Sequence, residues 1–127
     1  MYGVARFCTL LAMKRNLNVE LATTCGMLHD IFYMSGGTSD HHAAKGAEQA
    51  ETILKKMKLY SDDEIKIITT AISRHSDKTH IHEPYDEILK DADVMDHCLY
   101  NPAFPIAQKE KERYHNLLIE FGINEAK

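Results

Sequence analysis

Long apolar runs and an excess of positive charge are both missing from this sequence. No apolar stretch approaches the roughly 20 residues that a membrane-spanning helix requires, so we expect no membrane partner. The chain carries 15 Lys and Arg against 19 Asp and Glu, and the basic residues are scattered among acidic ones. A formal net charge of -4 gives no long-range attraction for a phosphate backbone, so we also expect no nucleic-acid partner.

Cysteine is scarce as well. Cys8, Cys25 and Cys98 are odd in number, widely spaced and surrounded by apolar helical sequence, which excludes the disulfide framework of a small secreted protein. We predict that they are reduced core residues. The first residues contain neither a basic leader nor a small-residue cleavage site, and we therefore expect a cytoplasmic protein.

Alternating, strand-like stretches are absent, and apolar residues recur instead at three-residue and four-residue spacing. This period predicts an all-α fold, and 127 residues suit one domain with one core. We expect a single compact bundle of about six helices over residues 1–127. The expected ranges are about 2–15, 18–32, 38–57, 61–75, 84–99 and a last helix that passes through Tyr114 and Phe121 before Gly122.

Local signals mark several of these helix starts. Asn18 is predicted to cap the second helix, and Thr38, Ser39 or Asp40 to cap the third. Ser61 followed by Glu64 is a capping-box pattern, and Pro84 suits a first helical turn.

The sharpest chemical feature is the pair His29 and Asp30, which follows Leu28 at the end of an apolar helix. Adjacent helical residues point about 100° apart, so both side chains can reach one metal ion only if it lies beside the helix. An imidazole nitrogen beside a carboxylate oxygen suits Zn, Mn, Fe, Co or Ni. A His-Asp pair by itself also arises by chance, and a buried histidine is more often a hydrogen-bonded core residue.

A carboxylate inside the fifth apolar helix is the second feature. Asp93 lies among apolar residues of that helix, where a charge is costly unless a cation or a metal ion compensates it. We therefore predict a partner for Asp93, whereas Asp91 is expected on another helix face, toward solvent.

In order along the chain, the His29-Asp30 pair, a histidine before Gly46-Ala47, Ile72 with His75, and Ala92-Asp93 with Asp96 resemble the metal-dependent phosphohydrolases of the HD-domain superfamily. The resemblance covers nearly the whole chain. It implies a helical fold, a bound divalent metal ion and the hydrolysis of phosphate esters or anhydrides.

The resemblance also implies roles for individual residues. The metal ligands are His29, Asp30 and Asp93, and the ion is Mn, Fe, Co, Ni, Zn or Mg. Catalytic roles fall on Asp30, which could bridge two ions, and on His42 and His75. Candidate contacts to substrate are His41, Lys45, Arg74, Lys78 and Asp96, although lysines near helix ends are usually solvated.

One position departs from the family pattern. The family's first metal histidine falls just before Met1. Either a longer protein supplies this histidine or the site is incomplete, and we favour the first explanation.

The sequence therefore predicts a hydrolase that acts on a small phosphorylated metabolite, most plausibly a nucleotide. The alternatives are a catalytically silent HD-fold module that binds or regulates and, less favoured, a di-iron oxygenase. The sequence leaves the oligomeric state open and is compatible with a homo-oligomer.

Overall fold

The computed structural model describes residues 2–30, 42–100 and 105–123, without the side chains of Tyr2, His42 and Tyr100. The helices are α1 (Tyr2–Lys14), α2 (Val19–Leu28), α4 (His42–Met57), α5 (Asp62–Arg74), α6 (Pro84–Tyr100), the short 3-10 helix η1 (Gln108–Glu110) and α7 (Lys111–Glu120). No strand occurs in the described ranges, and the all-α prediction is confirmed. None of the described helices combines the length and the apolar character needed to cross a bilayer.

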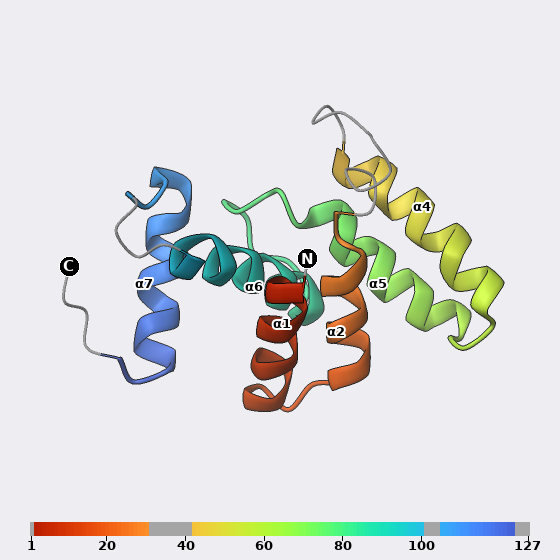
Figure 1. The fold of residues 1–127 in the computed structure, drawn as a ribbon, viewed down its shortest axis with the longest axis horizontal. Helices are drawn as coiled ribbons and strands as arrows, with labels where there is room; N and C mark the ends of the chain where they lie inside the picture. Colours follow the sequence, from red (N-terminus) through yellow and green to blue (C-terminus); the bar gives the residue numbers. More distant parts are fainter. Residues whose placement is uncertain (1, 31–41, 101–104, 124–127) are drawn as a thin grey trace.

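Helix α6 lies at the centre of the arrangement (Figure 1). It packs against α1, α2, α5 and α7, while α4 packs against α5. In the view of Figure 1, the α4–α5 pair and α7 lie at opposite ends of the molecule. Consequently α6 has neighbours on several sides, which decides the surroundings of the acidic residues that it carries.

Three predicted helix boundaries are confirmed. The Asn18 side chain accepts a hydrogen bond from the Leu21 backbone N–H at 3.0 Å at the start of α2. Ser61 and Glu64 form the reciprocal capping box of α5, with bonds of 2.8 and 3.2 Å. Pro84 begins α6, where its missing N–H costs no helical hydrogen bond. The predicted caps of α4 at residues 38–40 lie outside the described residues.

The end of α2 differs from the prediction. The helix ends at Leu28 rather than near Phe32, and His29 is its C-cap. The His29 ring donates through Nδ1 to the Gly26 carbonyl oxygen at 2.7 Å, and so satisfies one of the carbonyls left without a partner at a helix end. Phe32 itself lies outside the described residues.

Close packing of α1 on α2 fixes the position of this helix end. A Cβ atom added to Gly26 would lie 2.6 Å from the Ala5 Cα, so only glycine permits this approach of the two backbones. The predicted core cysteines Cys8 and Cys25 are fully buried around this contact, and Cys98 is buried in α6. His29 therefore follows a rigid, well-packed turn.

Candidate metal centre

His29 and Asp30 lie side by side where α2 ends. His29 is 1% exposed, and its Nδ1 bond to Gly26 fixes the orientation of the ring. The Nε2 atom then lies 3.0 Å from Oδ2 of Asp30, whose side chain is partly exposed. The imidazole is therefore held by the backbone on one side and faces a carboxylate on the other.

His75, the C-cap of α5, is held in the same manner. Its Nδ1 donates to the Ile72 carbonyl oxygen at 2.6 Å, and its Nε2 lies 3.8 Å from Oδ1 of Asp30. The rings of His29 and His75 meet edge to face, with centroids 5.3 Å apart. Two helix ends thus direct two Nε2 atoms toward the two oxygens of one carboxylate.

Asp93 reaches the same place from α6. Its Oδ1 lies 3.9 Å from Nε2 of His29. Its Oδ2 forms an ion pair with the Lys78 ammonium at 2.9 Å. The structure therefore brings together the three predicted metal ligands, although Asp93 is more than 60 positions from His29 in the sequence. Their role as ligands remains a prediction.

The pKa values of the two histidines are shifted in opposite directions. Burial lowers the pKa of His75 to about 4, and the positive charges of His29 and Lys78 oppose the bond to the Ile72 carbonyl, which would raise it. Burial also opposes charge on His29, but the hydrogen bond and negative charge of Asp30 outweigh it and raise the pKa of His29. Near neutral pH, His75 is therefore a neutral imidazole with its Nε2 lone pair toward Asp30.

These donors fit a divalent ion in type and orientation. Histidine ligands of metals commonly donate their other ring N–H to a carbonyl, as both rings do here. Ligands held at about 2.0–2.2 Å in a tetrahedral site lie roughly 3.3–3.6 Å apart, and the separations of 3.0, 3.8 and 3.9 Å bracket that range. Among the described side chains, however, no three histidine, cysteine or acidic residues are already grouped closely enough to hold an ion.

A cavity of about 270 Å³ opens beside this cluster. The lining residues are Asp30, His75, Ser76, Lys78, Asp93, His97, Lys109 and Glu110. The sequence analysis did not assign Ser76, His97, Lys109 or Glu110 to the site. Lys109 and Glu110 belong to η1, and no motif or spacing connects that segment with the histidines.

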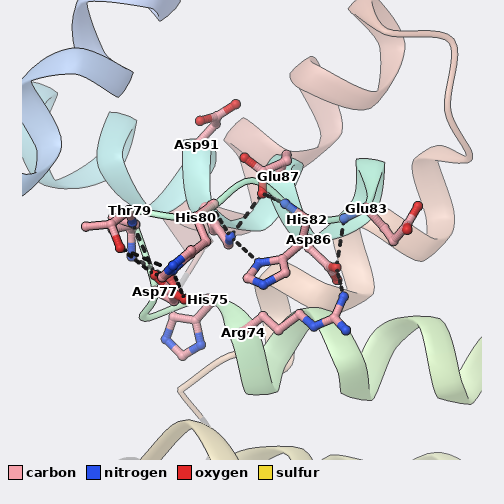
Figure 2. Close-up of polar contacts among 12 residues, drawn as sticks. Arg74, His75, Asp77, Thr79, His80, His82, Glu83, Asp86, Glu87 and Asp91 are labelled. Atoms are coloured by element: carbon pink, nitrogen blue, oxygen red, sulfur yellow. Dashed lines mark hydrogen bonds and ion pairs between the residues drawn. The ribbon is translucent and has the colours of Figure 1, made fainter.

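A second, larger cavity of about 610 Å³ lies beside the loop of residues 76–83 and α7, and Lys78 and Lys109 border both cavities. The loop is held by the fully buried Lys90, whose ammonium donates to the His80 carbonyl at 2.8 Å and to the His82 ring at 2.6 Å. Figure 2 shows His80 and His82 along the loop, with the His82 backbone N–H donating to Glu87. The backbone that carries Lys78 is thus fastened to α6.

The other predicted substrate contacts lie in different surroundings. In Figure 2 the Arg74 side chain points away from His75 and toward Asp86, which it binds at 2.7 Å. Lys45 is exposed on α4. Asp96 packs against α1, so closely that a Cβ atom added to Gly3 would collide with the Asp96 carboxylate. His41 and the side chain of His42 lie outside the described residues.

The prediction that Asp91 faces solvent is wrong. Asp91 is 7% exposed and accepts from Arg15 at 2.7 Å and from Arg113 at 2.9 Å. The two arginines come from the end of α1 and from α7, which cover this side of α6. Helical periodicity alone could not show that these segments meet there.

Comparisons with known proteins identify the family and support the fold. The HD domain family model matches residues 1–98. A predicted HD superfamily hydrolase from an uncultured Thermotogales bacterium, known from a crystal structure, is 22% identical over 95% of this chain and 74% of its own, with a TM-score of 0.67. A search of curated proteins gave no match. On the strength of the family match over residues 1–98, this chain belongs to the HD domain family, which groups it with metal-dependent hydrolases.

Proposed function

We propose that this protein is a metal-dependent phosphohydrolase that cleaves a phosphate ester or anhydride of a small metabolite, most plausibly a nucleotide. One observation carries the proposal. His29 and Asp30 at the end of α2 and Asp93 on α6 converge on one cluster, next to His75 and a cavity of about 270 Å³. Family membership supports the reaction class, and the donor chemistry supports the metal.

His29, Asp30 and Asp93 would hold the divalent ion. When bound, such an ion lowers the pKa of a coordinated water and neutralises negative charge on the phosphoryl oxygens. Asp30 offers one oxygen toward His29 and the other toward His75, an arrangement that suits a carboxylate shared by two ions. Neutral His75 is placed to accept a proton from a water or to bind a phosphoryl oxygen after protonation.

Positive charge at the cavity supports an anionic substrate. Lys78 and Lys109 both border the cavity, and lysine binds phosphate as a point charge. Asp96 lies one helical turn from Asp93 and could hold a ligand or a sugar hydroxyl. We keep His41 and Lys45 as proposed substrate contacts and His42 as a proposed catalytic residue, whereas Arg74 forms an ion pair with Asp86.

The proposal is tested with a panel of nucleoside mono-, di- and triphosphates and simple phosphate esters, in the presence of Mn²⁺, Co²⁺, Mg²⁺ or Ni²⁺. We expect release of phosphate or pyrophosphate from some member of the panel, and loss of at least about a thousandfold in turnover in Asp30→Ala. The matched control is Asp63→Ala, which removes an exposed carboxylate in the first turn of α5 and should retain full activity. A metal-loaded protein with no turnover on the whole panel contradicts the proposal.

A catalytically silent binding module is the second candidate. It is favoured by the ion pair of Lys78 with Asp93 and by the lack of a closed ligand group among the described side chains. This module would bind a nucleotide without turning it over. Calorimetric binding of a nucleotide that is never hydrolysed, with any of the four ions, would support it over the hydrolase.

A further inference from the structure

The Lys78 side chain is a deeply buried charge beside the proposed metal ligands. It is 5% exposed, whereas the Asp93 carboxylate that it neutralises is 31% exposed. The ammonium lies 2.9 Å from Oδ2 of Asp93 and donates to the His75 carbonyl oxygen at 2.6 Å. A lysine thus supplies the positive charge that Asp93 requires within the apolar helix.

We propose that Lys78 is an internal counter-cation that Asp93 exchanges for the divalent ion. The inference rests on the proposed function, in which Asp93 is a metal ligand. A divalent ion bound at Asp93 would lie close to the Lys78 ammonium in a partly buried site, where like charges repel each other. Ion binding at Asp93 and the Lys78 ion pair therefore compete.

The surroundings of Lys78 allow this exchange without movement of the loop. The loop backbone is fixed by Lys90 at the His80 carbonyl and by Arg113, which donates to the Lys78 carbonyl at 3.3 Å. Only the flexible side chain of Lys78 has to turn, and it borders both cavities already. The freed ammonium then faces the space where an anionic substrate would bind, so anion binding follows metal binding.

Lysine suits this role better than arginine. Its ammonium is a compact point charge on a rotatable stem, whereas the planar guanidinium forms two parallel bonds to a carboxylate and is harder to displace. Arg15 makes such a pair of bonds to Glu120, and Asp91 accepts one bond from Arg15 and one from Arg113. Asp93, in contrast, is paired with a lysine.

The test is Mn²⁺ affinity, measured by calorimetry, together with the thermal midpoint of the metal-free protein. Lys78→Met should bind Mn²⁺ about three- to tenfold more tightly than the natural protein, because the competing cation is gone. The same variant should unfold at a lower temperature without metal, since Asp93 loses its partner. If Lys78 only stabilised the loop, Lys78→Met would lower the thermal midpoint without raising the Mn²⁺ affinity.

Two further variants keep the result interpretable. Lys109→Met removes an equal charge at the same cavities and should change Mn²⁺ affinity less than about twofold. Lys78→Gln removes the charge but keeps a donor for the His75 carbonyl, and should also bind Mn²⁺ more tightly even if Lys78→Met folds poorly.

The possible outcomes separate this proposal from the proposed function. Unchanged Mn²⁺ affinity in both Lys78 variants, or an equal gain in Lys109→Met, overturns the exchange while the metal centre stands. Absence of Mn²⁺ binding in the natural protein and in every variant overturns both. Binding that appears only in the Lys78 variants supports the exchange most strongly.

Discussion

Asp91 and Asp93 are two residues apart on α6, yet their surroundings differ. Asp91 lies between Arg15 and Arg113, at 2.7 and 2.9 Å, with a side chain that is 10% exposed. Asp93 pairs with the Lys78 ammonium at 2.9 Å, and its side chain is 31% exposed beside a cavity. One helix therefore carries a carboxylate locked into the fold and another that stays accessible.

The partners explain the difference. Each arginine around Asp91 also binds a second acid, Arg15 at Glu120 and Arg113 at Glu87, so the group is a network that joins α1, α6 and α7. A network of forked bonds stabilises a fixed geometry. The Lys78 ammonium is a single point charge, so Asp93 can exchange it for another cation. His29 and His75 lie on the same side of α6 as Asp93.

The largest expected effect comes from the Asp91 side. Asp91→Asn leaves Arg15 and Arg113 without their shared carboxylate, and we expect a loss of about 2 kcal/mol in the free energy of unfolding, because Glu120 and Glu87 compensate in part. Urea denaturation measures this loss. Mn²⁺ affinity should not change, and a large drop in affinity would show that the two regions are coupled.

The Asp93 side should respond in the opposite way. Asp93→Asn removes a proposed ligand, and we expect Mn²⁺ affinity to fall at least about tenfold while unfolding changes by less than about 1 kcal/mol. Calorimetry and urea denaturation of the same preparation give both numbers. An asparagine variant with unaltered Mn²⁺ affinity would remove Asp93 from the metal centre.

The smallest expected effect is on the loss of thermal stability at acidic pH. The hydrogen bond from Arg15 lowers the pKa of Glu120 below its ordinary value of 4.5. A carboxylate with a lowered folded pKa contributes stability above that ordinary value and loses the contribution as the pH falls through the folded pKa. Thermal midpoints recorded from about pH 5 to about pH 3 should therefore fall less in Glu120→Gln than in the natural protein. Equal slopes would show that the Glu120 bond does not contribute.

Much of the fold was predictable because its signals are local. The Asn18 cap and the Ser61–Glu64 box involve residues three positions apart, so the sequence shows both partners at once. The all-α class follows from apolar spacing in the same way. The predicted end of α2 lies several residues beyond the observed one. The His29 ring bonds to the Gly26 carbonyl in place of a further helical turn, and the spacing of apolar residues does not reveal such a bond.

The candidate site was predictable only in part. The resemblance pointed to His29, Asp30 and Asp93, and the structure places them together. The partner of Asp93 was expected to be a cation or a metal, but nothing in the sequence singled out Lys78, because the path of a loop depends on tertiary contacts such as Lys90 with His80. The same reason explains Asp91, whose partner Arg15 is 76 positions away.

The central claim is that one divalent ion is bound by His29, Asp30 and Asp93, and anomalous diffraction from a crystal soaked in Mn²⁺ tests it most directly. We predict a strong peak about 2.1 Å from Nε2 of His29 and from carboxylate oxygens of Asp30 and Asp93. A peak bound by other residues, with these three side chains beyond coordination distance, would contradict the account.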